Sequence, residues 1–397
     1  SLAETSNLKS LFLSILKNNK YLIKDFLFIV VINSPSNASD DIRENNFRSI
    51  CLLKEIMNEQ IINLGFIDAY TPGNEMPTKE AGVGLARKIG MDEALKYFDY
   101  SNKKKNILIC LDADCTVNSK YIETFHNLGN DLTFHAGYTS YEHPSDESTP
   151  EGRGILYYEI FLRYYVAGLI YSNSPYAFHT VGSTMTCTPD AYIKIEGMNK
   201  RKAGEDFYFL EKLSKQFIIK FISGAIVYPS PRKSFRVPFG TGRSIAKFID
   251  SFEQIPELYN PEVFTVLKKW NECFYNSSST CINSYLIESK NISPQLYRFL
   301  ISQGFLESLE KICRNSKSPL QFYKQKQQWF DGFRTMKLIH FLRDSQFGYM
   351  EMFSALRSFF KMYPIECNFD DKSANSMSFF EKTEYLQLLK YLDRDLK

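Results

Sequence analysis

Two aspartates, Asp112 and Asp114, follow directly after a short apolar run in the stretch NILICLDADCTV, residues 106–117. A short apolar run bounded by polar residues predicts a buried strand. Two carboxylates at the end of such a strand repel each other, and removing them from water is costly. The pair therefore predicts a positive group between the aspartates, or chemistry performed by one of them. Solvation of both carboxylates in a loop is the alternative that these residues leave open.

Three other segments carry residue types suited to the same site. The helical stretch KEAGVGLARKIGMDEALKYF carries Arg87 and three glycines within nine residues, and because glycine is unfavourable inside helices, a close approach by another group is expected. Glu205 and Asp206 open a helix in KAGEDFYFLEKL, where acidic residues also complement the helix dipole. The basic stretch PSPRKSFRVPFGTGRS carries Arg232, Lys233, Arg236 and Arg243 around a Gly-Thr-Gly turn. Arginines of such a loop could close over phosphate groups, or the loop could simply be solvated.

Short apolar strands alternate with helical patterns from residue 26 to about residue 230. This alternation predicts an α/β layered fold with a mostly parallel central sheet. In such sheets ligands bind beyond the carboxyl ends of the strands, which is where Asp112 and Asp114 are expected.

Helical patterns replace this alternation after about residue 245. Ser293 and Ser318 each precede a proline, as at helix starts, and Ser378 and Glu381 have capping-box spacing. The sequence therefore predicts a helical extension over 1–25, the α/β domain over 26–244 and an all-helical domain over 245–397. The aromatic helix ILYYEIFLRYYVAGLIY, residues 155–171, is expected either to pack in a core or to line an acceptor groove.

Composition excludes several classes of protein. The 397-residue chain has a net charge of only +3 and no long basic tail, which argues against nucleic-acid binding. Its eight cysteines form no CxxC pair and no cluster with histidine, which fits a reducing, cytoplasmic compartment. The most apolar stretch, FLFIVVI, is too short to span a bilayer. Contact with a membrane surface and the oligomeric state stay open.

Taken in order, these motifs resemble the nucleotide-sugar-dependent glycosyltransferases of family 2, which have the GT-A fold. The resemblance covers roughly residues 26 to 245. It rests on the DxD pair, on the GxxxAR-type helix from Gly82 to Arg87, and on the Gly-Glu-Asp at 204–206. It implies a Rossmann-like GT-A domain that transfers a sugar, as hexosyltransferases do, from a nucleoside-diphosphate sugar. The acceptor would be a hydroxyl of a glycan or another molecule, and the transfer would invert the anomeric centre.

The resemblance also implies roles for individual residues. Asp114, together with Asp112, would hold a divalent cation, Mn²⁺ or Mg²⁺, although Asp112 could instead contact the ribose. Asp206 would be the catalytic base, with Glu205 beside it. Asn33 and Asp68 would face the nucleotide base, Arg87 would lie near the diphosphate, and Gly182 and Ser183 would lie on the acceptor side. Independently of the resemblance, the basic loop suggests that Arg236 and Arg243 close over the diphosphate.

Two other functions compete with this interpretation. LDADCTV also fits the DxDxT motif of HAD-type phosphatases, with Asp112 as nucleophile, Asp114 as acid and the acidic pair at 205–206 as later metal ligands. That family places its motif on the first strand, whereas two strands and two helices are expected before it here. A catalytically inactive protein that binds nucleotide sugars is the third alternative.

Overall fold

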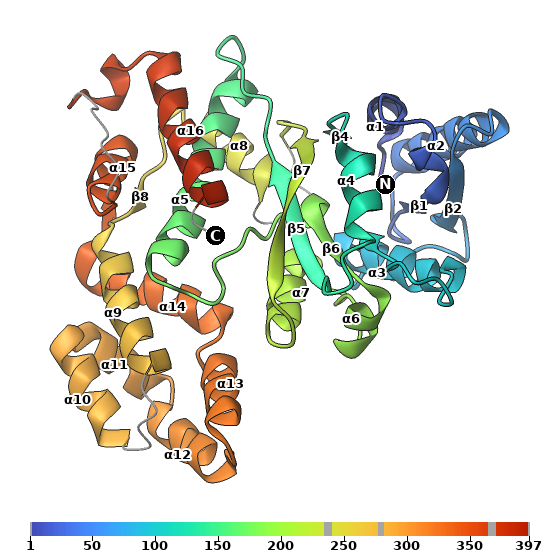
Figure 1. Cartoon of the computed structure of the whole chain (residues 1–397). Helices are drawn as coiled ribbons and strands as arrows, with labels where there is room; N and C mark the ends of the chain where they lie inside the picture. Colours follow the sequence, from blue (N-terminus) through green and yellow to red (C-terminus); the bar gives the residue numbers. More distant parts are fainter. Residues whose placement is uncertain (1, 234–239, 277–281, 364–370, 396–397) are drawn as a thin grey trace. The chain divides into compact units, whose positions relative to one another are not determined.

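The computed structural model of the chain describes residues 2–233, 240–276, 282–363 and 371–395 (Figure 1). The chain divides into two compact units. Unit 1 comprises Ser1–Asp146 and Thr180–Ala246, and unit 2 comprises Glu147–His179 and Lys247–Lys397. Among the described residues, no helix has both the length and the apolar character needed to cross a membrane.

The first strands of unit 1 form a parallel pair joined by a helix. β1 (Leu27–Asn33) pairs with β2 (Asn63–Ala69), and α2 (Asp40–Asn58) connects them. Asn33 is the last residue of β1, and Asp68 is the penultimate residue of β2. The carboxyl ends of the two strands therefore lie side by side, as the alternating pattern predicts for this pair.

The second sheet of unit 1 has five strands in the order β3-β6-β5-β7-β4. In chain order these are β3 (Leu108–Ile109), β4 (Cys115–Val117), β5 (Ala136–Tyr141), β6 (Met185–Cys187) and β7 (Ile219–Pro229). Among the described strands β5 and β7 pair in parallel, while β3 with β6, β5 with β6 and β4 with β7 are antiparallel. The predicted mostly parallel sheet is therefore not confirmed. An apolar run indicates burial but not direction, and the five residues between β3 and β4 are too few for a parallel crossover.

Unit 1 contains further helices. They are α1 (Thr5–Leu16), α3 (Val83–Ala94), α4 (Tyr121–Leu128), α6 (Pro189–Lys194), α7 (Glu205–Ser214) and the start of α8 (Thr241–Asp250), with short 3₁₀ turns at Leu22–Asp25, Leu95–Tyr97 and Gly182–Thr184. Leu8 and Ile15 of α1 are buried in one cluster with Ile32 of β1. The hydroxyl of Ser14 accepts a hydrogen bond from the Val117 N–H of β4 at 3.1 Å. Helix α1, which lies within the predicted N-terminal helical extension 1–25, thus packs in the core of unit 1.

In its described residues unit 2 is helical apart from an antiparallel pair of two-residue strands, β8 (Leu258–Tyr259) and β9 (Tyr349–Met350). Its helices are α5 (Pro150–Tyr171), the end of α8, α9 (Glu262–Asn276), α10 (Ile282–Ile292), α11 (Pro294–Ser302), α12 (Phe305–Asn315), α13 (Pro319–Trp329), α14 (Gly332–Leu342), the π-helical Arg343–Phe347, α15 (Met352–Phe360), the 3₁₀ turn Ala374–Ser376 and α16 (Phe379–Asp395). The predicted caps are confirmed. Ser293 and Ser318 accept hydrogen bonds at the starts of α11 and α13, and Ser378 and Glu381 bond reciprocally at the start of α16.

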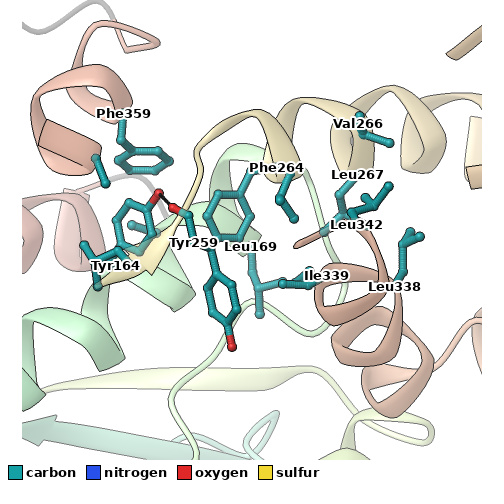
Figure 2. Packing of buried hydrophobic residues seen from close by; sticks show 14 of the residues in the cluster. Tyr164, Leu169, Tyr259, Phe264, Val266, Leu267, Leu338, Ile339, Leu342 and Phe359 are labelled. Carbon is teal, nitrogen blue, oxygen red and sulfur yellow. Dashed lines mark hydrogen bonds between the residues drawn. The ribbon is translucent and has the colours of Figure 1, made fainter. Parts of the chain in front are cut away.

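Helix α5 belongs to unit 2, although the sequence places its residues in the α/β domain. Arg163 of α5 is buried and pairs with Asp393 of α16 at 2.6 Å, which ties α5 to the last helix of the chain. The Tyr164 hydroxyl donates to the main-chain oxygen of Tyr259 at 2.7 Å, and its ring contacts Phe264 edge to face (Figure 2). Of the two expectations for the aromatic helix, packing in a core therefore holds for Tyr164.

A tightly packed glycine in α5 offers a test of this core. A methyl group on Gly168 would overlap the ring of Phe264, which is fully buried and has no room to move. We expect Gly168→Ala to lower the free energy of unfolding by about 1–3 kcal/mol, as overpacked cores do. Urea-induced unfolding followed by circular dichroism measures this change. Gly65→Ala is the matched control, because nothing lies within 4 Å of its new methyl group. Equal stability of both variants would contradict the packing described here.

Candidate active site

The glycine-dense start of α3 lies directly against the chain segment that leads into α7. A methyl group on Gly84 would overlap the main-chain oxygen of Arg201, and one on Gly82 would lie 2.8 Å from the Cα of Lys202. The close approach that the glycines predict is therefore made by the protein's own backbone. It brings Arg87, one turn further along α3, to the N-terminus of α7.

Arg87 joins two acids that are far apart in the sequence. Its Nη2 donates to Asp112 Oδ1 at 2.7 Å, and its Nη1 donates to Glu205 Oε1. The Arg87 and Glu205 side chains are only 10% and 5% exposed. Burial lowers the pKa of Arg87, but the charges of Asp112 and Glu205 outweigh this effect and raise the pKa above its ordinary value. Arg87 is therefore a permanent cation between the end of β3 and the start of α7.

Gly182 makes room for this cation. A methyl group on Gly182 would overlap the guanidinium of Arg87. The neighbouring Ser183 is buried, and its hydroxyl hydrogen-bonds with the thiol of Cys115. Of the two residues predicted for the acceptor side, Gly182 thus lies against Arg87 and Ser183 hydrogen-bonds with Cys115.

Asp206 follows Glu205 in the first turn of α7 and is half-buried. Burial raises the pKa of Asp206, against the opposing effects of Arg87 and of a hydrogen bond from the Phe207 N–H. Burial also raises the pKa of Glu205 to about 7, although the charge of Arg87 opposes this shift. Two adjacent carboxyl groups therefore hold protons more tightly than exposed acids do, and either can exchange a proton closer to neutral pH.

A second arginine neutralises the other aspartate of the DxD pair. The Nε and Nη2 atoms of Arg232 both donate to Asp114 Oδ2, at 3.0 and 2.8 Å. The same Nη2 donates to Glu4 Oε1, just before α1. Burial and the charge of Asp112 still raise the pKa of Asp114 above its ordinary value.

The contact between Arg232 and Asp114 follows from the sheet. Cys115 of β4 lies opposite Pro229 of β7, so the residues before β4 and after β7 are neighbours. Glu4 has no predicted role, and Arg232 is predicted only as one of four basic residues of a loop that could close over phosphates, because the pairing of β4 with β7 has no signal in the sequence. The basic stretch at 229–244 is the only clue, and it does not single out Arg232.

The residues predicted to bind the nucleotide base lie at the ends of β1 and β2. The main-chain oxygen of Asn33, itself buried, accepts a hydrogen bond from the Asn46 amide at 3.0 Å. The Asp68 carboxylate accepts hydrogen bonds from the N–H groups of Tyr70 and Thr71 at 3.0 and 3.1 Å. Burial raises the pKa of Asp68, but the bonds from Thr71 outweigh it and lower the pKa. In this structure Asp68 therefore stabilises its own turn.

The two arginines predicted to close over the diphosphate have different outcomes. Arg243 is the third residue of α8, and its side chain is exposed. Arg236 lies outside the described residues. The described residues therefore do not place Arg236 and Arg243 together beside Arg87.

The carboxylates of this region fit a divalent cation that a substrate helps to hold. Oxygen donors of this kind suit Mg²⁺ and Mn²⁺, and Mg²⁺ is commonly bound by one or two carboxylates together with substrate phosphates. The guanidinium groups of Arg87 and Arg232 contact four carboxyl groups, those of Glu4, Asp112, Asp114 and Glu205, and Asp206 lies next to the last of these in the chain. In the part of the chain that the structure describes, no group of three or more His, Cys, Asp or Glu residues could hold a metal unaided. Asp112 and Asp114 therefore suit a divalent cation that also has phosphate oxygens among its ligands.

Comparisons with known proteins assign no function to this chain. No protein-family model matches the sequence, and no curated protein matches it. Among solved structures, the chain is similar to S. aureus TarS 1-349, with a TM-score of 0.40 and 11% sequence identity over 83% of this chain and 89% of that chain. Values this low carry no argument about fold or function.

The pKa of Glu205 gives a pH test of the site. Glu205 keeps its proton in the folded state up to about pH 7, whereas its ordinary pKa is 4.5. The folded state is therefore favoured at low pH and loses this stabilisation as the pH rises from about 4.5 through about 7. We expect wild type to lose up to about 3 kcal/mol of unfolding free energy relative to Glu205→Gln over that interval. Urea titrations of both proteins at several pH values measure the difference, and parallel pH profiles would contradict it.

Proposed function

We propose that the chain is a family 2 glycosyltransferase with a GT-A-type domain, which moves a sugar from a nucleoside-diphosphate sugar to a hydroxyl acceptor with inversion. The observation that carries the proposal is the Arg87 bridge. It joins Asp112, at the end of β3, to Glu205, which opens α7 beside Asp206. The DxD pair, the helical arginine and the acidic pair, separate in the sequence, thus form one charged cluster.

On the donor side, Asp112 and Asp114 are the proposed ligands of Mg²⁺ or Mn²⁺, which when bound would act as a Lewis acid toward the leaving diphosphate. The Asp112 side chain is 38% exposed, so its carboxylate is open to a ligand while Oδ1 accepts from Arg87. Arg87 orients that carboxylate and offsets the charge around it. Asn33 and Asp68 are proposed to face the nucleotide base, and Arg236 and Arg243 to close over the diphosphate.

On the acceptor side, Asp206 is the proposed general base. Direct displacement at the sugar requires a carboxylate that takes the acceptor's proton as the new bond forms. The raised pKa of Asp206 makes it a stronger base than an exposed aspartate. Glu205 is held by Arg87 and fixes the start of α7, which positions Asp206. Gly182 is proposed to allow this geometry by leaving space for the guanidinium, and Ser183 to border the acceptor side.

A turnover experiment tests this proposal. The protein is incubated with Mn²⁺, a simple sugar acceptor and UDP, GDP or dTDP sugars in turn, and nucleoside-diphosphate release is followed. With the sugar that supports turnover, Asp206→Asn should lower kcat by about 10²- to 10⁴-fold, because it cannot accept the proton. The affinity for the nucleotide sugar should change little. Asp190→Asn is the matched control, since Asp190 is an exposed aspartate in the first turn of α6.

Other outcomes would reassign the roles. Normal turnover in Asp206→Asn together with loss in Glu205→Gln would make Glu205 the base. Normal turnover in both variants would place the reaction outside this cluster. Hydrolysis of p-nitrophenyl phosphate without sugar transfer would favour the phosphatase, and binding of a nucleotide sugar without turnover would favour an inactive binding protein.

A further inference from the structure

The carboxylate best suited to hold a metal ion already has a cation beside it. Two N–H groups of Arg232 converge on a single oxygen of Asp114, Oδ2, at 2.8 and 3.0 Å. A divalent cation binds a carboxylate oxygen at about 2.0–2.1 Å, closer than these nitrogen atoms. The two N–H groups of Arg232 use both lone pairs of Oδ2, so the ion can bind this oxygen only when at least one of these hydrogen bonds breaks. A cation bound through the other carboxylate oxygen would still repel the positive charge of Arg232 across the same group.

Arg232 has a second anchor that would keep it nearby after displacement. Its Nη2 atom also donates to Glu4, whose side chain is only 4% exposed. The other oxygen of that carboxylate, Oε2, accepts from the Asn7 amide at 2.5 Å, and Glu4 directly precedes α1, which packs in the core of unit 1. Glu4 is therefore a fixed point, so a guanidinium that leaves Asp114 stays close to the site.

We propose that Arg232 is a built-in counterion for Asp114, which a divalent cation must displace, and that Glu4 retains the displaced guanidinium beside the bound nucleotide. The proposal rests on the proposed function in treating Asp114 as a cation ligand. Arg232 and Glu4 are positioning residues in this scheme. The free protein should bind the cation weakly, because Arg232 holds Asp114. A nucleoside diphosphate should strengthen cation binding, because its phosphates attract both the cation and the displaced Arg232.

The charge of the site supports this exchange. Arg232 contacts the carboxylates of both Glu4 and Asp114, so one positive charge faces two negative charges. Replacement by a doubly charged ion improves that balance, once phosphate oxygens are present to complete the coordination of the ion.

Binding of Mn²⁺ to the protein without nucleotide tests the competition directly. Electron paramagnetic resonance of free Mn²⁺ gives the dissociation constant for wild type, Arg232→Gln and Lys233→Gln. We expect Arg232→Gln to bind Mn²⁺ about tenfold more tightly or better, because the competing cation is gone. Lys233→Gln is the matched control: it removes the same charge from the adjacent, exposed residue and should change the affinity by less than about threefold. Adding Asp114→Asn to Arg232→Gln should abolish the gain.

Each other result has a defined meaning. Mn²⁺ binding by Arg232→Gln that is equal to or weaker than that of wild type would overturn the proposal. An equal gain in affinity in Lys233→Gln would also overturn it, because the gain would then come from the lower net positive charge and not from the contact with Asp114. If Arg232→Gln does not fold, Arg232→Met replaces it, because it keeps an apolar side chain of similar length without the charge, and a gain in affinity is again required. Sugar transfer by a wild type that binds no Mn²⁺ would overturn the counterion role and leave the transferase standing. The predicted gain without any sugar transfer would support the counterion role and reject the transferase.

Discussion

The arrangement of unit 1 depends on one buried cation, the guanidinium of Arg87. It sits between Asp112 and Glu205, and its position requires the close approach of Gly84 to the segment before α7 and the absence of a side chain at Gly182. Removing one partner of a buried ion pair leaves an uncompensated charge, which typically costs about 3–5 kcal/mol. The interaction that holds Asp112 and Glu205 together is therefore also one that the fold can hardly lose.

The two units are stabilised by different chemistry. Around the site in unit 1, acids outnumber the arginines that contact them, and burial raises the pKa of Asp114, Glu205 and Asp206 together. Unit 2 relies on a continuous aromatic and aliphatic core in which rings such as Phe264 and Trp270 are fully buried. Acids with raised pKa values thus lie where function is proposed, while the helical unit combines its apolar core with the buried ion pair between Arg163 and Asp393.

The sequence predicts local features well and long-range pairings poorly. Helix caps such as Ser293 and Ser318 depend on neighbouring residues, so their pattern is legible. The acids and Arg87 are also identifiable, because the aspartate pair directly follows an apolar run and the arginine lies in a glycine-dense helical stretch. The direction of β4 and β6 depends on distant partners, and no local pattern encodes it. The Arg232 contact depends on that pairing, which is why a positive group is predictable for Asp114 while its identity is not.

The path of the chain between the units has a consequence for dissecting the protein. The segment 147–179, which contains α5, lies in sequence between β5 and β6 but packs with the C-terminal helices through Arg163 and Tyr164. Neither unit is therefore a contiguous stretch of polypeptide. A fragment ending near residue 245 would carry α5 without the partners that cover Ile160 and Tyr164, both fully buried in the intact chain. A fragment beginning there would lack the central helix of its own core. Expression of either unit alone requires α5 to be excised from one fragment and rejoined to the other.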